Sequence, residues 1–356
     1  MKFIFWTARF FFRVLTLASR QKRLSKNLVI SAGPKGWESI EFKELYSTAV
    51  EWLGADNVTA VKYHPQIAVR EELKNCSHYF YDPRTGYDYF EKPSRRWRRC
   101  IIRAIKIGVI CAWRGITPIA YVTDLNQSDW RNFSFLVTAT SGFVFCFLSI
   151  NSIDRRYLQH SRITGPMPLA LSYELSEKFP VRLNTARQSL ISFSGSLYEP
   201  RKTFIYELRD KCQTEGYDFV INSRGPGGPR SSDDQYWKEL SESMFVVSTT
   251  TPSVEGGVNC FGNLRQMVYR FSEALLTGAC LISDVPDGVE RYFKPGEDFV
   301  VADTADDVIE ILHDFYRRPE FYHNIARRGQ SKAQAMARCS FFWNSVNTAL
   351  GTESIC

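Results

Sequence analysis

The stretch that most restricts the fold of this chain is residues 269–284, with the sequence YRFSEALLTGACLISD. Phe271, Ala274 and Leu275 recur at helical spacing, which places an apolar stripe along one side of a helix. Gly278 can end that helix, because glycine enters the left-handed conformation without steric cost. The apolar run 279–283 follows at once, as in a strand that is covered on both faces. A helix that leads into a buried strand predicts a domain of the α/β class.

Two charged residues lie on this helix away from its apolar stripe. Arg270 and Glu273 are three positions apart and therefore share one side of the helix. The segment 255–263 precedes the helix, and a glycine-rich loop before a helix N-terminus can bind an anion. The glycines of this loop are Gly256, Gly257 and Gly262. Glu273 could accept hydrogen bonds from the hydroxyls of a sugar. The alternative is that Arg270 and Glu273 form only a surface ion pair.

The length and composition suit a globular protein of two domains. A chain of 356 residues exceeds one ordinary core, and 44% hydrophobic with 23% charged residues is typical of folded proteins. The nine cysteines form no C-x-x-C pair and no Cys/His grouping of the kind that binds zinc. Cys111, Cys146 and Cys280 lie in apolar runs, which predicts free core thiols, no structural zinc and a reducing compartment.

The first 24 residues have the pattern of an amphipathic helix. The basic side of that helix spans roughly 40° on a helical wheel. Its members are Lys2, Arg9, Arg13 and Arg20. Arginines in the middle of the segment argue against a transmembrane helix and against a cleaved signal peptide. Two alternatives remain: a helix that lies on an anionic membrane, and a helix that packs on the protein's own core.

A second basic segment, residues 95–99, has the sequence RRWRR. Much of the excess behind the net charge of +7 lies in these two segments. Basic residues around an aromatic one can bind phosphates or lipid headgroups, although most basic runs are solvated helix faces. No recognised nucleic-acid-binding motif accompanies residues 95–99. We therefore expect no nucleic-acid partner and keep an anionic membrane surface as a possible one.

The first half of the chain alternates strand and helix patterns. We expect a strand at 28–31, a helix at 42–54 and a strand at 118–124. Asp124 ends the last of these strands, and open α/β sheets place ligand groups at the carboxyl ends of their strands. Asp124 could act as a general base toward an acceptor hydroxyl, or it could cap the next helix.

Residues 270–312 resemble a known family. The segment RFSEALLTGACLISDVPDGVERYFKPGEDFVVADTADDVIEIL is similar to the nucleotide-sugar half of GT-B glycosyltransferases of the "group 1" superfamily. The similarity is greatest to the branch that includes the CgeB-like spore-coat proteins, and it extends over roughly residues 190–335. This resemblance implies two Rossmann-like domains that face across a cleft, with a C-terminal helix that crosses back to the first domain. It also implies no metal ion and no cofactor besides a nucleoside-diphosphate sugar as co-substrate.

The resemblance implies which residues bind the donor. Related enzymes place a glycine after a strand, and a basic residue soon after it, against the donor diphosphate. Here these positions are Gly195 and either Arg201 or Lys202, although a basic residue at a helix start is unremarkable alone. The glycine lets the backbone approach the ligand, and Arg201 would neutralise the leaving group. Glu273 would bind ribose or sugar hydroxyls, and Arg270 with the glycine loop would stabilise the diphosphate.

Two further positions bear on the donor site. Arg224 lies in a Gly/Pro-rich loop after a predicted strand, where it could contact a nucleotide base or phosphate, or lie in an ordinary surface loop. Arg265 departs from the family pattern, because many relatives have a glutamate eight residues before the helix glutamate. Glu255 could replace that glutamate.

Together these patterns predict a glycosyltransferase with Asp124, Arg201 and Glu273 as its catalytic residues. The acceptor would be a glycan, lipid-linked or polysaccharide, docked on the first domain. The expected divisions are an N-terminal helix at 1–24, an acceptor domain at 25–180, a nucleotide-sugar domain at 185–335 and a C-terminal helix and tail at 336–356. We expect a cytoplasmic location, peripheral on the inner face of a membrane. The alternative function is a catalytically inactive GT-B-like scaffold at a membrane surface.

Overall fold

The computed structural model describes most of the two sheets and their helices. The described residues are 27–31, 40–61, 69–81, 93–122, 143–146, 162–164, 167–168, 170–180, 187–223, 232–250, 265, 267–338 and 340–351. The chain forms two compact units: unit 1 comprises Met1–Ser172 and Ser340–Cys356, and unit 2 comprises Tyr173–Cys339. The last helix therefore belongs to unit 1, as expected of a C-terminal helix that returns to the first domain.

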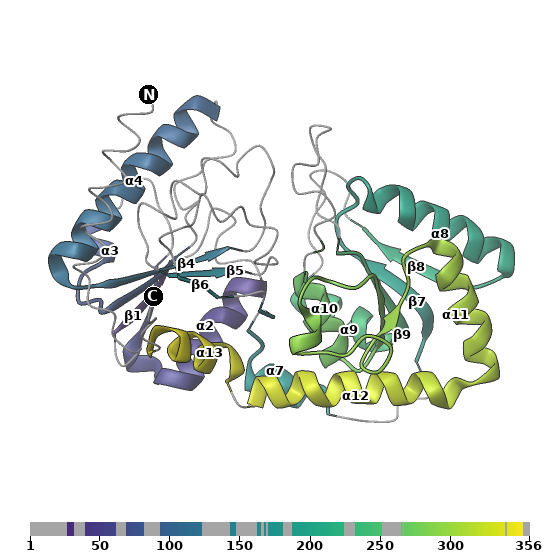
Figure 1. The fold of residues 1–356 in the computed structure, drawn as a ribbon. Helices are drawn as coiled ribbons and strands as arrows, with labels where there is room; N and C mark the ends of the chain where they lie inside the picture. Colours follow the sequence, from purple (N-terminus) through teal and green to yellow (C-terminus); the bar gives the residue numbers. More distant parts are fainter. Residues whose placement is uncertain are drawn as a thin grey trace. The chain divides into compact units, whose positions relative to one another are not determined.

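Unit 1 is built on a parallel sheet of six strands in the order β2-β1-β3-β4-β5-β6 (Figure 1). The strands are β1 (Leu28–Ser31), β2 (Val58–Val61), β3 (His78–Tyr81), β4 (Thr117–Val122), β5 (Phe143–Cys146) and β6 (Arg162–Thr164). The helices are α2 (Ile40–Leu53), α3 (Val69–Glu72), α4 (Pro93–Arg114) and α13 (Phe341–Gly351), with a 3-10 turn at Ala55–Asn57. All four residues of β1 and of β3 are buried, as parallel strands with covered faces require.

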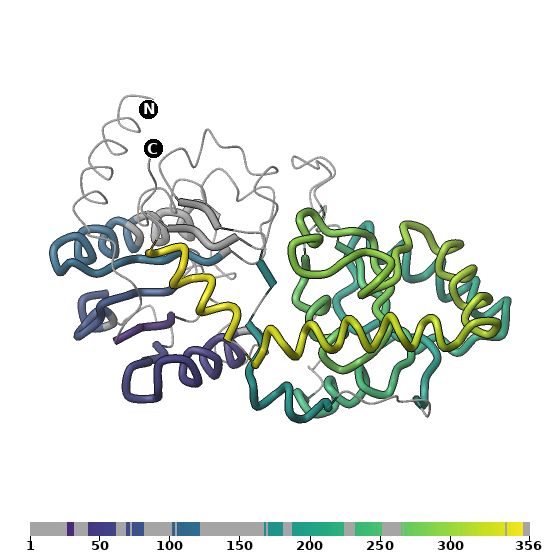
Figure 2. The backbone as a smooth tube through the Cα atoms, turned by 60° about the horizontal axis from the view of Figure 1, so that its bottom comes forward, coloured from purple at the N-terminus to yellow at the C-terminus, as the bar shows by residue number. Residues whose placement is uncertain are grey.

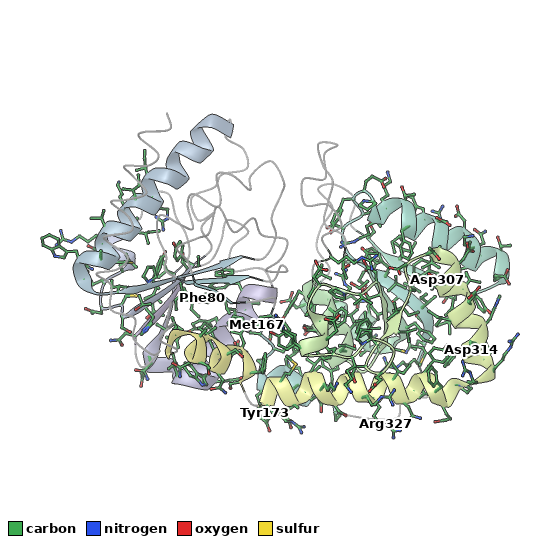
Figure 3. The ribbon with its side chains drawn as sticks, in the orientation of Figure 1. Phe80, Met167, Tyr173, Asp307, Asp314 and Arg327 are labelled. Atoms are coloured by element: carbon green, nitrogen blue, oxygen red, sulfur yellow. The ribbon has the colours of Figure 1, made fainter. Side chains whose placement is uncertain are left out.

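Aromatic side chains fix α13 on this sheet. Phe80, labelled in Figure 3, stacks on Tyr121 with ring centroids 4.8 Å apart and meets the ring of Trp343 edge-on at 5.2 Å. The indole Nε1 of the fully buried Trp343 donates a hydrogen bond to Thr48 Oγ1 on α2 at 3.0 Å. A buried aromatic ring with its polar atom satisfied is a strong anchor, so α13 is part of the core of unit 1.

Unit 2 contains a parallel sheet of five strands in the order β11-β10-β9-β7-β8. The strands are β7 (Ser189–Ser194), β8 (Phe219–Asn222), β9 (Ser243–Ser248), β10 (Cys280–Ser283) and β11 (Val300–Val301). The helices are α7 (Tyr173–Lys178), α8 (Arg201–Glu215), α9 (Asp233–Glu242), α10 (Tyr269–Leu276), α11 (Ala305–Arg317) and α12 (Pro319–Arg338), with a 3-10 turn at Val289–Arg291. Helices α8 and α11 pack side by side, and α12 runs along unit 2 against α10 (Figure 2).

Local sequence signals explain where several of these helices begin and end. Thr304 and Asp307 form a reciprocal capping box at the start of α11, which satisfies backbone N–H groups that the first turn leaves free. Gly216 ends α8 in the left-handed conformation, with φ 75°. Gly278, at φ 76°, follows α10 and leads directly into β10. The predicted helix and buried strand around residues 269–283 are thus confirmed.

Other predicted elements are confirmed as well. The strand at 28–31 is β1, the helix at 42–54 is α2, and the strand at 118–124 is β4, which ends at Val122. Cys111 and Cys280 are buried free thiols, as expected from the apolar runs around them. None of the helices in the described parts of the chain is both long enough and apolar enough to cross a membrane.

Arg187 binds four backbone oxygens at the amino-terminal edge of the sheet of unit 2. Its Nη1 donates to the carbonyl oxygens of Ser241 and Ser243 at 3.0 and 2.7 Å. Its Nη2 donates to those of Thr277 and Gly278 at 3.3 and 2.6 Å. One guanidinium therefore ties together the segments that enter β9 and β10.

We expect Arg187→Met to lower the free energy of unfolding by about 2 kcal/mol, because it leaves four backbone oxygens without their donor. Urea unfolding followed by circular dichroism measures the change. Arg209→Met is the matched control, because Arg209 is exposed and its guanidinium contacts only side chains of α8, those of Asp210 and Tyr206, among the described residues. Equal stability of the two variants would contradict the role assigned to Arg187.

Candidate functional site

The strand order of unit 2 places a switch point between β7 and β9. From β7 the chain moves outward to β8, returns to β9 on the other side of β7, and continues to β10 and β11. In open parallel sheets, ligands bind outside the carboxyl ends of the strands where the order reverses in this way. Polar residues end the strands here in register, with Ser194 opposite Asn222 and Ser248 opposite Ser283.

Gly195 directly follows β7 at this switch point. Its φ is +153°, a conformation that residues with a side chain rarely adopt. Its N–H donates to the carbonyl oxygen of Asn222 at 3.0 Å, which holds the turn beside β8. A Cβ atom on residue 195 would overlap the Nη1 atom of Arg270. Glycine is therefore needed at this position to make room for the guanidinium of Arg270. The sequence suggests a second reason, which is that glycine lets the backbone approach a ligand closely.

Glu273 is the buried carboxylate of the site. It lies on α10 with only 3% of its surface exposed, and Tyr236 Oη on α9 donates a hydrogen bond to its Oε2 at 2.5 Å. The surface-pair alternative for Arg270 and Glu273 is therefore wrong. The cause is the packing of α9 against α10, which covers the side of the helix that the sequence pattern leaves facing solvent.

Arg270 lies between two aromatic rings beside this carboxylate. Its guanidinium carbon is 5.7 Å from the ring centroid of Phe193 and 5.9 Å from that of Tyr236. Burial opposes the charge of Arg270, but Tyr236 and Glu273 outweigh it and raise the pKa of the guanidinium. Burial raises the pKa of Tyr236 well above its usual value, and Glu273 adds to that effect. The cluster therefore presents a fixed cation, a neutral phenol and a buried carboxyl group at the switch point.

Removing the phenol of Tyr236 tests its role as the hydrogen-bond donor to Glu273. We expect Tyr236→Phe to lower the free energy of unfolding by roughly 1–2 kcal/mol, because a buried acceptor loses a partner. Chemical denaturation measures this change. Tyr206→Phe on α8 is the control, since Tyr206 is exposed and should alter stability by less than about 0.5 kcal/mol. A Tyr236→Phe protein as stable as the control would show that the hydrogen bond contributes nothing.

Arg201, at the start of α8, is buried and holds the end of β9. Its Nε donates to Thr249 Oγ1 at 2.7 Å and its Nη2 to the Thr249 carbonyl oxygen at 3.2 Å. Its guanidinium carbon also lies 4.2 Å from the ring centroid of Tyr198. Lys202 is exposed, with its ammonium group over the ring of Tyr206. Of the two predicted basic residues, the structure thus places Arg201 among the strand ends and Lys202 on the outer surface of α8.

Arg265, which departs from the family pattern, takes part in a polar network near the end of β10. Its Nη1 contacts Asp303 Oδ1 at 2.8 Å, and its Nε lies 3.8 Å from Asp284 Oδ2. Asp284 in turn accepts hydrogen bonds from the N–H and the hydroxyl of Thr250. An arginine at this position therefore joins the segments that follow β9, β10 and β11. A glutamate at the same position would be repelled by the carboxylates of Asp284 and Asp303.

Several buried polar atoms in or next to the strands β7 and β10 have no hydrogen-bond partner among the described residues. They are the hydroxyl oxygens of Ser192, Ser194 and Ser283 and the Nε atom of Arg270. Buried polar groups are nearly always paired in folded proteins, so such a group requires an explanation. Ser194 precedes Gly195 in the chain and the guanidinium of Arg270 lies next to Gly195, so two of these atoms belong to residues beside the switch point.

Other predicted site residues lie outside the described residues: Asp124, Arg224, Gly256, Gly257 and Gly262. The N-terminal segment 1–24 lies outside them as well. Among the residues that are described, no group of three or more His, Cys, Asp or Glu side chains is placed to hold a metal ion.

Sequence reasoning missed Tyr236 and Thr249. Tyr236 is 37 positions before Glu273, and only the packing of α9 on α10 brings the two together. A signal for Thr249 is visible in the sequence, because a run of polar residues, STTT at 248–251, begins at the last residue of the apolar strand β9. Such a run at the carboxyl end of a buried strand is typical of a ligand-facing edge.

Comparison with known proteins identifies the fold. Residues 201–341 match a family described as Glycosyl transferase-like. HepE of Anabaena, solved in complex with UDP and glucose, superposes with a TM-score of 0.53 at 11% identity, covering 91% of this chain and 97% of HepE. The fold is that of the GT-B glycosyltransferases. The β-glucosyltransferase of phage T4 shares this GT-B fold, with a TM-score of 0.50 at 11% identity and coverage of 91% and 99%. No curated protein matches the sequence.

The family match covers most of the candidate site, although Phe193, Ser194 and Gly195 precede it. It begins at Arg201 and extends through β8, β9, α10, β10 and α12. The predicted GT-B fold is confirmed, with one parallel α/β sheet in each unit. The match does not distinguish the CgeB-like branch from the rest of the family.

Proposed function

We propose that this protein is a glycosyltransferase that moves a sugar from a nucleoside-diphosphate sugar to a glycan acceptor. The single observation that carries the proposal is the Tyr236–Glu273–Arg270 cluster at the switch point of unit 2. HepE, which has the same fold, was solved with UDP and glucose and with UDP-glucose. We place the donor of the present chain at the carboxyl ends of β7 and β9 by analogy.

Each residue of the cluster has a role in this proposal. Glu273 accepts hydrogen bonds from the ribose or sugar hydroxyls, and Arg270 faces the diphosphate. Arg201 fixes Thr249 at the strand end and adds positive charge beside the phosphates. Fixed donors that stabilise the charge on a leaving group are among the largest contributions to such catalysis. Lys202 lies on the exposed side of α8, so we propose Arg201 rather than Lys202 as the basic residue beside the phosphates.

The transfer itself joins the acceptor oxygen to the anomeric carbon and breaks the bond from that carbon to the diphosphate. The nucleoside diphosphate leaves with the bonding electron pair, and the hydroxyl proton passes to a base, for which we retain Asp124. We propose that the reaction needs no metal ion, because the cations Arg270 and Arg201 supply the charge compensation. The CgeB-like branch and a lipid-linked or polysaccharide acceptor remain part of the proposal.

A second candidate is a GT-B-like scaffold that binds without turnover. The observation that favours it is Arg265, which stands where many relatives have a glutamate and which is bound to Asp303 and Asp284. Turnover separates the two candidates, since a scaffold releases no product from any donor.

The test is donor turnover with a set of UDP- and GDP-sugars, measured as released nucleoside diphosphate. We expect one nucleotide class to be consumed, and Glu273→Ala to reduce the rate by about a hundredfold. Glu239→Ala is the matched control, because Glu239 lies on α9 and its carboxylate accepts a hydrogen bond from the exposed Gln235 on the same helix. Wild-type protein that binds a nucleotide but consumes no donor, with or without a glycan mixture, would favour the scaffold.

A further inference from the structure

Helix α4 of unit 1 has two apolar faces. One contains Ile107 and Cys111, which are buried against the rest of the unit. The other is exposed, and we call it the outer stripe of α4: Ile102 (44% exposed), Ile105 (36%), Val109 (44%) and Trp113 (89%). Figure 3 shows side chains projecting from α4 away from the sheet of unit 1. A helix on the surface of a globular protein normally has one apolar stripe that faces the core and a polar face toward the solvent.

The outer stripe is continuous along the helix. Its residues are spaced by three, four and four positions, which keeps them within roughly 80° on the helical wheel and spreads them over about 16 Å of helix. Nine large hydrophobic residues are exposed in the described parts of the chain, and four of them are in this stripe. Single exposed apolar residues need no explanation, whereas a contiguous group marks an interaction surface.

All the charged residues of α4 are positive, and the two acidic residues of α3, Glu71 and Glu72, lie on the neighbouring helix. Helix α4 contains seven Arg and Lys residues and no Asp or Glu. Residues 1–24 contain six Arg and Lys and again no Asp or Glu. The whole chain has 45 basic and 38 acidic residues. Outside these two segments, 32 basic residues remain beside all 38 acidic ones, so the rest of the chain has a net negative charge. The basic excess of this protein therefore resides in these two segments alone.

Basic and apolar positions fall on the same side of α4. Lys106 is exposed and lies within the arc of the outer stripe, about 20° from the position of Trp113. Positions 95, 98 and 99 of the basic run fall on or next to that arc by helical spacing. A surface that combines exposed tryptophan, branched aliphatic side chains and cations matches the boundary between the headgroups and acyl chains of a bilayer.

We propose that the outer stripe of α4 docks on an anionic membrane surface. The helix lies parallel to the membrane, with Trp113, Val109 and Ile105 at the level where acyl chains begin. Tryptophan prefers this interface, because its ring is apolar while its N–H finds a polar partner there. Lys106 pairs with anionic headgroups, because the negative surface potential of such a membrane attracts basic side chains that lie close to it.

Charge decides among the possible occupants of the stripe. The segment 1–24 is itself strongly basic, and a second copy would bring its own basic α4, so both would meet like charge across the contact. A nucleic acid would satisfy the cations but would leave the aliphatic stripe in water. An anionic bilayer satisfies both the cations and the apolar side chains. The inference rests on unit 1 alone and does not depend on the donor site of unit 2.

The test is co-sedimentation of the full chain with phosphatidylcholine vesicles, with and without phosphatidylglycerol. We expect strong binding only to the anionic vesicles, weakened by high salt. Trp113→Ser should weaken it by about tenfold, and Lys106→Glu should weaken it and reduce its dependence on salt. Both side chains are exposed, so the unfolding temperature should match that of the wild type, and this is measured for each variant.

Tyr316→Ser is the matched control, because Tyr316 is an exposed aromatic residue (63%) of unit 2. It should bind vesicles as the wild type does. Three results would overturn the proposal: no binding of the wild type to anionic vesicles, equal binding of Trp113→Ser and wild type, or a dimer in sedimentation velocity that Trp113→Ser dissociates. The second would assign binding to another segment such as 1–24, and the third would assign the stripe to a second copy.

Discussion

Gly195→Ala is expected to weaken nucleotide binding by at least about a hundredfold, which corresponds to about 2.7 kcal/mol. The added Cβ would occupy the space of Arg270 Nη1, and the guanidinium would have to leave its position between Phe193 and Tyr236. The residue would also hold a φ of +153°, which costs a side-chain-bearing residue roughly 1–3 kcal/mol. Isothermal titration calorimetry with the preferred nucleoside diphosphate measures the loss.

Gly216→Ala separates the contact with Arg270 from the backbone cost. Gly216 also has a positive φ, +75°, but a Cβ there would meet no atom within 4 Å. Its substitution should reduce stability by about 1 kcal/mol and leave nucleotide affinity unchanged. If both variants bind nucleotide as the wild type does, the guanidinium of Arg270 is not part of the donor site.

Gly329→Ala is expected to lower the free energy of unfolding by about 3 kcal/mol. Gly329 lies on α12 where the helix crosses α10, and a Cβ would overlap the backbone oxygen of Asp298 and approach Leu275 Cδ2 to 2.7 Å. A backbone oxygen cannot rotate away as a long side chain can. The same segment is fixed by Lys332, which forms an ion pair with the buried Asp298, so little relaxation is available.

Urea unfolding of Gly329→Ala and of Ser331→Ala measures this effect on one helix. Ser331 is exposed, and its replacement should change stability by less than about 0.5 kcal/mol. Because alanine has the higher helix propensity, a local effect alone would make both variants equal to or more stable than the wild type. That result would contradict the close packing of α12 against Asp298 and α10.

The parts of the fold that could be predicted are those in which local periodicity and burial agree. The helix and strand around residues 269–283 combine a stripe of apolar residues, a glycine stop and a short buried run, so each signal supports the same assignment. Strand β3 could not be found in this way. Its sequence, HYFY, gives no clear signal, because histidine and tyrosine each have both polar and apolar parts. All four residues are nevertheless buried in the sheet of unit 1.

The candidate site could be predicted only in part. The local pattern and the family resemblance predict Glu273 and Gly195 as site residues, and the structure places both beside Arg270. Their partners could not be identified, since the hydrogen bond from Tyr236 and the contact between Gly195 and Arg270 join segments far apart in sequence. The same limit explains Arg201, whose position at a helix start was evident but whose bonds to Thr249 depend on tertiary packing. The fold could thus be predicted from the resemblance, whereas the arrangement of the candidate site depends on the packing of α9, α10 and β7.

The most direct test of the donor site is calorimetric titration of UDP, GDP, ADP and CMP into the wild type and into Glu273→Ala. A donor site at the switch point of unit 2 predicts that the wild type binds one of these nucleotides selectively. It also predicts that Glu273→Ala weakens that binding by about tenfold or more while the protein stays folded, because a buried carboxylate no longer accepts the ligand's hydroxyls. Folded wild-type protein that binds none of the four at millimolar concentration would contradict a donor site at the switch point of unit 2.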